Sequence, residues 1–172
     1  MAAFMTMTGF AIPAKAAPEE VFASAEAITD AREINFNRNW KFKLGDEVGA
    51  EAIAYEDSDW EDEQLPHDFS ITQEYSGELE AESGFLPGGA GWYRKTFTLP
   101  GDYQGKTIVL NFDGVYNHAY VYVNGQKLGE NHYGYNDFAL DISDYVTCDG
   151  KTENVVAVKV VHNTPSSRWY SG

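Results

Sequence analysis

The feature that most constrains the fold of this chain is a series of short segments in which apolar and polar residues alternate. Ile108, Leu110 and Phe112 share one parity, and residues 119–123 alternate in the same way. A period of two places apolar side chains on one face of a β-strand. Asn124-Gly125 follows directly and is the dipeptide most typical of a two-residue hairpin, because both residues accept a positive φ. This part of the chain therefore predicts a β-hairpin.

Three further segments, residues 34–44, 92–99 and 154–161, are rich in aromatic or β-branched residues and are predicted as strands. Several short strands separated by turn residues, with little helical periodicity, indicate an all-β chain. We expect an antiparallel β-sandwich. Two long connections, residues 46–59 and 71–91, interrupt the strands. Loops of this length in a sandwich often carry function.

Composition limits the partners that the chain can have. Apolar residues make up 43% of the sequence and aromatic residues 15%, which is enough for the core of one domain. The formal net charge is −15. Nucleic acids and anionic membranes bind basic surfaces, so we expect neither as a partner. A neutral ligand such as a sugar is compatible with this charge.

No pattern predicts a metal or a cofactor. Cys148 is the only cysteine, so the chain has no internal disulfide, and its neighbours are typical of a turn. The four histidines lack the spacing of a zinc site. Asp137, Asp141 and Asp144 do not match a calcium-binding loop and are expected to cap turns.

The N-terminal 17 residues are predicted to be a signal peptide. An apolar run over residues 2–12 precedes Ala14-Lys15-Ala16, which fits a cleavage site. No basic residue precedes Lys15, so the usual basic start is missing, and a disordered or structural lead-in is the alternative. Residues 18–31 are predicted as a linker and 32–172 as the domain. A signal peptide implies a secreted, periplasmic or cell-surface protein.

Two blocks combine groups that recognise sugars. A sugar site needs an aromatic plane and charged hydrogen-bonding groups, and Arg168 with Trp169 supplies both. His67 and Asp68 supply an imidazole beside a carboxylate that can accept two hydroxyl groups. The alternatives are that Asp68 caps backbone N–H groups in a turn, and that Arg168 is exposed beside a core tryptophan.

Four blocks together resemble the N-terminal sugar-binding domain of glycoside hydrolase family 2, which contains β-galactosidases, β-glucuronidases and β-mannosidases. They are Leu-Pro-His-Asp-Phe at 65–69, Gly-Trp-Tyr-Arg-Lys at 91–95, Gly-Tyr-Asn-Asp-Phe at 134–138 and Ser-Arg-Trp-Tyr-Ser-Gly at 167–172. Phe69 stands where the family usually has Trp. The resemblance extends over residues 34–172 and implies a jelly roll of the galactose-binding-domain type.

The resemblance is greatest to β-galactosidases, and it implies the front part of an enzyme that hydrolyses terminal β-galactosides with retention. It places Asp68, Arg168 and Trp169, with His67 behind them, at the edge of the sugar pocket. The last block is the middle of a segment in the family, so the domain is expected to be cut at its C-terminal edge.

We assign no catalytic residue to this chain. Retaining glycosidases need two carboxylates about 5–5.5 Å apart. Glu78, Glu80 and Glu82 alternate, but no apolar wall accompanies them to raise a pKa. In family 2 the catalytic glutamates lie in a (β/α)8 barrel beyond an immunoglobulin-like domain, so the chain alone is expected to be inactive.

Two other functions fit the same sequence. One is a free-standing, non-catalytic carbohydrate-binding module, which would bind sugar as an isolated chain. The other is a structural domain that buttresses a catalytic barrel, with exposed aromatic residues that cover a neighbouring domain.

Overall fold

The computed structural model describes residues 5–9, 26–27, 33–79, 81 and 84–162. These residues form β-strands and short 3₁₀ turns, and none of them is in an α-helix. The strands are β1 (Met5–Gly9), β2 (Glu26–Ala27), β3 (Glu33–Asn35), β4 (Trp40–Leu44), β5 (Glu61–Glu63), β6 (Gly89–Thr98), β7 (Ile108–Phe112), β8 (His118–Val123), β9 (Gln126–Asn131), β10 (Phe138–Asp141) and β11 (Glu153–His162).

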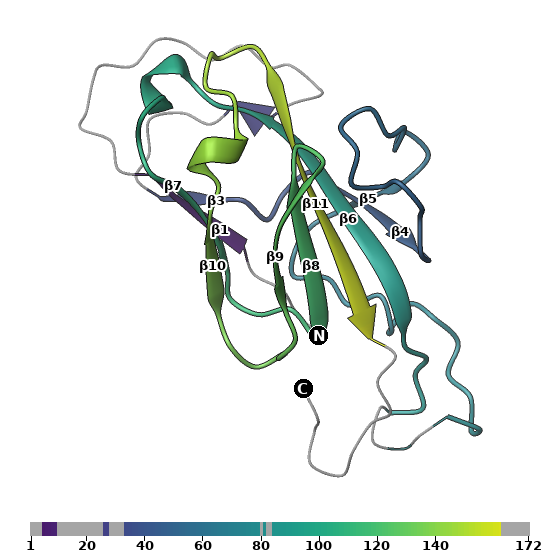
Figure 1. Cartoon of the computed structure of the whole chain (residues 1–172). Coiled ribbons are helices and arrows are strands. Elements are labelled where there is room, and N and C mark those ends of the chain that lie inside the picture. The colour runs from purple at the N-terminus through teal and green to yellow at the C-terminus, as the bar shows by residue number, and fades with distance from the viewer. Residues whose placement is uncertain (1–4, 10–25, 28–32, 80, 82–83, 163–172) are drawn as a thin grey trace.

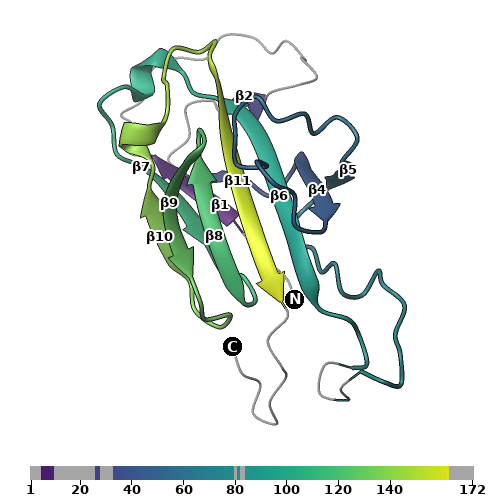
Figure 2. The ribbon, with the colours of Figure 1, turned by 45° about the vertical axis from the view of Figure 1, so that its right-hand side comes forward.

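Two sheets face each other (Figures 1 and 2). The smaller has the strand order β10-β7-β1-β3, and the larger has the order β5-β4-β6-β11-β8-β9, with β2 paired to β6. All pairs are antiparallel except that of β2 with β6. The predicted all-β antiparallel sandwich is confirmed.

The hydrophobic core lies between the sheets. Ile108, Leu110 and Phe112 of β7 are at most 1% exposed, as their shared parity predicted. They belong to one cluster with Val121 of β8 and Val158 of β11. Burial of apolar surface on this scale, at about 25 cal/mol per Å², is the main term that holds the two sheets together.

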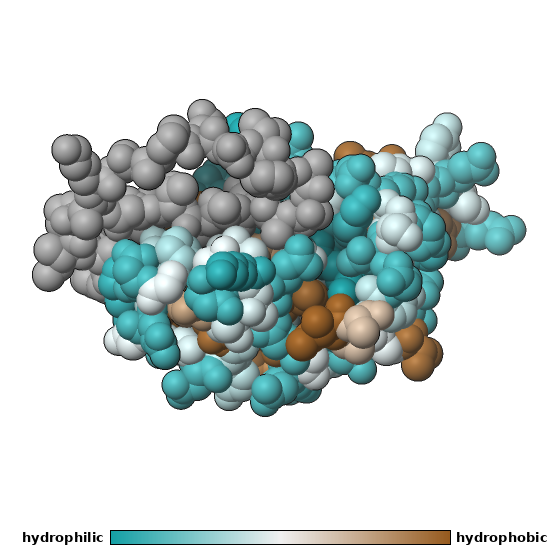
Figure 3. All heavy atoms as spheres, turned by 90° about the horizontal axis from the view of Figure 1, so that it is seen from above, coloured by the Kyte–Doolittle hydropathy of each residue, from teal (hydrophilic) through white to brown (hydrophobic). Residues whose placement is uncertain are grey.

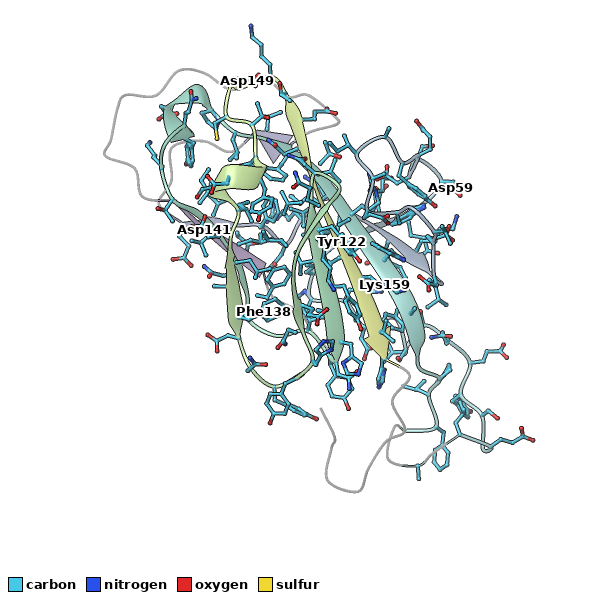
Figure 4. All side chains as sticks on the ribbon, in the orientation of Figure 1. Asp59, Tyr122, Phe138, Asp141, Asp149 and Lys159 are labelled. Carbon is cyan, nitrogen blue, oxygen red and sulfur yellow. The ribbon has the colours of Figure 1, made fainter. Side chains whose placement is uncertain are left out.

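The centre of the larger sheet is the pairing of β6 with β11, which runs over ten residues of each strand. Both faces of β6 are covered, because residues 46–60 fold back over the outer face, where Trp92 and Trp60 are buried. Lys159 of β11 reaches Asp46 in the same loop, with Nζ and Oδ1 2.6 Å apart. Figure 4 shows Lys159 and Tyr122 on neighbouring strands of this sheet, with Asp59 in the covering loop.

Arg94 fastens this loop to the sheet. Its side chain is 2% exposed, and its Nε donates a hydrogen bond to Oδ2 of Asp57 at 2.7 Å. The guanidinium also donates to the carbonyl oxygens of Ala50 and Ala52. Residues 46–59, one of the two long connections, thus cover the outer face of the larger sheet.

The Asn-Gly hairpin is confirmed. Asn124 and Gly125 have φ values of 49° and 81° and join β8 to β9, with Val123 opposite Gln126. The Asn124 side chain does more than turn the chain. Its amide donates to the carbonyl oxygen of Tyr145 at 2.7 Å and its oxygen accepts from the backbone N–H of Val155 at 2.8 Å. It thus ties the hairpin to the start of β11.

The strand predicted over residues 34–44 is wrong in one respect, because the segment divides into β3 and β4 in different sheets. Asn39 has a positive φ of 57°, and the Asn35 side chain accepts a hydrogen bond from the backbone N–H of Asn37. This turn lets the chain cross the sandwich. Phe36 and Trp40 still point into one core, since they are both fully buried.

The N-terminal segments contain more structure than a leader and a linker require. Met5–Gly9 is the strand β1, within the predicted signal peptide, and Glu26–Ala27 is the strand β2, within the predicted linker. Cleavage after residue 16 or 17 stays a prediction. Among the described residues, no helix is long and apolar enough to cross a membrane.

Replacement of Arg94 by Met should lower the free energy of unfolding by about 3 kcal/mol, because it leaves Asp57 and two carbonyl groups without their partner in a largely buried place. The matched control is Lys43→Met, which removes the exposed ion pair with Asp59 in the same loop and should change stability little. Urea unfolding of both variants measures the difference. Equal effects would show that Arg94 does not fasten the loop.

Candidate functional site

A cavity of about 120 Å³ opens at the end of the sandwich where β11 ends and β6 begins. It reaches inward between the sheets, since Phe112 of β7 and Val158 of β11 both line it. Six side chains give it a polar lining: His67, Asp68, Ser70, Tyr93, Tyr116 and His162. Seen from the opposite end of the molecule, the described surface is mostly hydrophilic, with small apolar patches (Figure 3).

Residues 65–70, which follow β5, form one wall of the cavity. The backbone N–H of Leu65 donates to the carbonyl oxygen of Asn37 at 2.8 Å, which fixes the start of this segment. Oδ1 of Asp68 accepts a hydrogen bond from the backbone N–H of Ser70 at 2.9 Å. Asp68 therefore makes the capping turn that was the alternative from sequence, and it also lines the cavity. Phe69 is buried and stacks on Phe42.

His67 is held on three sides. Its Nδ1 lies 2.8 Å from the hydroxyl oxygen of Tyr93, within hydrogen-bond distance. Its Nε2 lies 3.7 Å from Oε1 of Glu63, and its ring packs edge-on against Phe42. Burial first, and then the charges of Asp68 and Glu63, raise the pKa of Tyr93, so this phenol stays protonated. The imidazole is thereby fixed in orientation next to the Asp68 carboxylate.

His162 forms the facing wall at the end of β11. Its Nδ1 lies 3.4 Å from Oγ of Ser70, and its ring packs edge-on against Tyr116 at 4.9 Å between centroids. Burial lowers the pKa of His162, and the nearby Asp68 carboxylate opposes that effect. The ring is therefore neutral at pH 7 and can donate one hydrogen bond and accept another.

Tyrosines form the outer rim on this side. Tyr116 contacts Tyr135 edge-on at 5.7 Å, and Tyr135 contacts Tyr133 at 5.8 Å. Tyr133 and Tyr135 are about half exposed. Gly134 lies beneath Tyr116, so closely that a Cβ atom there would fall 2.2 Å from the ring. The glycine between the two tyrosines is thus what lets the Tyr116 ring reach His162.

Of the four residues predicted for the sugar site, the structure brings His67 and Asp68 to one cavity. Arg168 and Trp169 lie outside the described residues. Sequence reasoning missed Tyr93, Tyr116 and His162 as cavity residues. Tyr93 and His162 belong to strands whose sequences are typical of a buried core. Only the register of β6 with β11 shows that both residues lie near the same cavity.

The carboxylates considered for catalysis do not form a pair in the described part of the chain. Glu78 is exposed in the connection before β6, and Glu80 and Glu82 lie outside the described residues. Within the described residues, no group of three His, Cys, Asp or Glu side chains is arranged to hold a metal ion. The cavity can bind hydroxyl groups through its carboxylate, imidazoles and phenols.

The model of the glycosyl hydrolases family 2 sugar-binding domain matches residues 21–170. The chain belongs to glycoside hydrolase family 2. Its fold class is that of an N-terminal sugar-binding domain of this family, as the four sequence blocks predicted.

Family 2 members of both substrate types resemble the chain. It is 40% identical over 153 residues to the β-galactosidase BoGH2A of Bacteroides ovatus, which covers 87% of this chain and 18% of that protein. It is 36% identical over 145 residues to a β-glucuronidase of Formosa agariphila, covering 82% of this chain and 14% of that protein. The chain thus spans less than a fifth of the length of these relatives.

A solved β-glycosidase structure has the same fold over most of the chain. The β-glycosidase from Bacteroides vulgatus superimposes with a TM-score of 0.71 at 41% identity, over 81% of this chain and 19% of that one. The family 2 domain described here therefore corresponds to one part of a larger protein in that relative.

Acidification should destabilise the family 2 domain through His162. Its pKa is lowered in the folded state, so the unfolded chain binds more protons below about pH 6.5. The stability that this difference contributes is complete above pH 6.5 and is lost as the pH falls. Urea unfolding at pH 7.5 and pH 5.0 should show a smaller loss for His162→Asn than for wild type. An identical loss in both would contradict this role.

Replacement of Gly134 by Ala should push the Tyr116 ring away from His162 and cost about 1–3 kcal/mol, the usual range for overpacking. Gly77→Ala is the matched control, because nothing lies within 4 Å of a Cβ atom there. It should stay within about 0.5 kcal/mol of wild type. Thermal unfolding gives both values, and the NMR shifts of the His162 ring should move only in the first variant.

Proposed function

We propose that this chain is the sugar-binding domain of an exported, β-galactosidase-type enzyme that hydrolyses terminal β-galactosides with retention. In this proposal Asp68 lies at the edge of the sugar pocket and accepts hydrogen bonds from sugar hydroxyls, with His67 behind it. Arg168 and Trp169 are proposed to complete the same edge. The catalytic glutamates belong to another part of the parent protein, so this chain alone has no hydrolase activity.

The observation that carries the proposal is the lining of the cavity. Its polar groups are one carboxylate, two imidazoles, one serine hydroxyl and two phenols, and no Lys or Arg is among the described residues that line it. Neutral sugars present hydroxyl groups, which these acceptors and donors match. A uronic acid presents a carboxylate, for which a charged guanidinium or ammonium group is the better partner. The described lining therefore matches a neutral galactoside, and a guanidinium enters the proposed site only through Arg168, which can donate hydrogen bonds to sugar hydroxyls.

The size of the cavity supports a shared site. Pockets that enclose a small ligand have volumes of about 300–1,000 Å³. The cavity of this domain has about 120 Å³. This volume is below that range, which supports a pocket that other parts of the parent enzyme complete. A free-standing carbohydrate-binding module is disfavoured for the same reason.

The connection before β6 supports a structural role for this domain in addition to sugar binding. It carries four exposed apolar side chains, which are Ile71, Tyr75, Leu79 and Phe85, with exposed fractions from 37% to 79%. The connection lies next to the cavity, since Ser70 and Leu86 at its two ends line it. Exposed apolar groups that gather in one loop are typical of an interface. We propose that they dock this end of the sandwich against the rest of the parent enzyme.

The decisive test is a chimera in which this chain replaces the matching N-terminal domain of BoGH2A from Bacteroides ovatus. The chimera should hydrolyse 4-nitrophenyl β-galactoside and leave the β-glucuronide intact. Asp68→Asn in the chimera should lower kcat/KM about 10- to 100-fold, the effect of one charge-assisted hydrogen bond of about 1.5–3 kcal/mol. Lys43→Met, at a residue that does not line the cavity, should leave kcat/KM unchanged.

Titration of the isolated chain with methyl β-galactoside, followed by NMR, separates the alternatives. The proposal expects no saturable binding tighter than about 1 mM, because one wall alone leaves most of the sugar in water. Micromolar binding would instead favour a free-standing module. A folded chimera whose activity does not respond to Asp68→Asn would remove Asp68 from the sugar pocket.

A further inference from the structure

Two histidine side chains meet on the larger sheet, where β8 begins and β9 ends. His118 is the first residue of β8, and His132 directly follows β9. Ala119 pairs with Asn131, so the antiparallel register brings the two histidines side by side. Their Nδ1 atoms are 2.9 Å apart, and their ring centroids are 4.9 Å apart. Neither histidine is among the described residues that line the cavity.

The backbone holds this histidine pair in place while the rings stay accessible. His118 pairs with Val161 of β11, so its strand has a neighbour on each side. β9 lies at the edge of the larger sheet (Figure 2). The His132 side chain is 47% exposed, and its ring packs edge-on against Tyr120 at 5.7 Å between centroids. A small solute can therefore reach the two Nδ1 atoms without opening the fold.

The carboxylate of Glu130 determines which nitrogen of His132 carries the hydrogen. Its Oε1 lies 3.1 Å from Nε2 of His132. Hydrogen bonds from Lys127 first, and then from His132, lower the pKa of Glu130, so it is ionised at pH 7. An ionised carboxylate only accepts, so Nε2 of His132 carries the hydrogen and Nδ1 of the neutral ring has a free lone pair. Histidines that bind metals commonly donate their other N–H to a carboxylate in this way.

The distance between the two Nδ1 atoms fits two bonds to one transition-metal ion. Imidazole nitrogens bind such ions at about 2.0–2.1 Å. Two bonds of this length whose nitrogens are 2.9 Å apart enclose an angle of about 90°. A right angle is typical of the square-planar or tetragonal coordination of Cu²⁺ and Ni²⁺, whereas tetrahedral Zn²⁺ needs a wider angle. The net charge of −15 attracts cations, and the nearby Lys127 is neutralised by Oε2 of Glu130 at 2.5 Å.

We propose that His118 and His132 form a surface binding site for Cu²⁺, in which both Nδ1 atoms are ligands and Glu130 orients the His132 ring. A small rotation of the exposed rings turns both lone pairs toward one ion. His118 then carries its hydrogen on Nε2 instead of Nδ1, so the number of bound protons does not change. Water completes the coordination, because the described residues offer no third His, Cys, Asp or Glu ligand there. The site is independent of the proposed sugar-binding function.

The test is a calorimetric titration of the full, untagged chain with CuCl₂ at pH 7.5. His118→Asn and His132→Asn should each weaken Cu²⁺ binding at least tenfold, because either change removes one of the two ligands. Glu130→Gln should weaken it about tenfold, the lower end of the usual effect of a residue that orients a metal ligand. Glu61→Gln removes the same charge from an exposed position on β5 and is the matched control, which should bind as wild type does.

Equal affinity for Cu²⁺ in wild type and both histidine variants would overturn the proposal. A loss in only one of the two variants would also overturn it, because the site requires both rings. NiCl₂ should bind more weakly than CuCl₂ and should respond to the same substitutions, as the usual order of affinities for nitrogen ligands predicts.

NMR of the unmodified chain keeps the proposal testable if a variant does not fold. Cu²⁺ is paramagnetic and broadens the signals of nearby protons. Added in less than equimolar amount, it should broaden the ring signals of His118 and His132 before those of the cavity residues His67 and His162. Equal broadening of all four rings, or earlier broadening of His67 or His162, would show that the ion does not select this site.

Discussion

The antiparallel pairing of β6 with β11 over ten residues brings Tyr93 and His162 to the same cavity. It sets His162 opposite Gly89 and Val158 opposite Tyr93, so that one end of the larger sheet carries the groups that line the cavity. Both strands are buried on both faces for most of their length. A slip of one residue would exchange core and outer positions along the whole sheet, so packing on two faces fixes the register firmly.

Two buried cations on neighbouring residues of β6 show how this sheet can be covered on both sides. Arg94 points outward and binds Asp57 and the carbonyl groups of the covering loop. Lys95 points inward, where its Nζ donates to the carbonyl oxygen of Arg38 at 2.6 Å and lies over the ring of Phe36. Each charge is desolvated but has oxygen partners, which is the condition under which burial of a charge is tolerated. The loop and the turn before β4 are thereby anchored to the same strand.

Much of the architecture was predictable, because alternation and turn chemistry are local. The alternation in β7 predicts which of its side chains face the core, and their burial confirms it. The Asn124-Gly125 dipeptide predicts a hairpin, and the positive φ values of both residues confirm it. The division of residues 34–44 into two strands was not predictable, because one positive φ at Asn39 carries the chain to the other sheet. The ion pair of Arg94 with Asp57 was not predictable either, because no pattern in the sequence identifies that partner.

The sequence by itself determined the all-β class and the family 2 domain, and it predicted His67 and Asp68 as site residues, since these inferences depend on local periodicity and on blocks of adjacent residues. The tertiary structure alone decided which residues meet at the cavity. His162 and Tyr116 are far from Asp68 in the chain, and only strand register and the missing side chain of Gly134 bring them together. It also placed Met5–Gly9 between β3 and β7. Pairing between distant strands depends on the complementarity of whole edges and faces, and a linear pattern of residues does not contain that information.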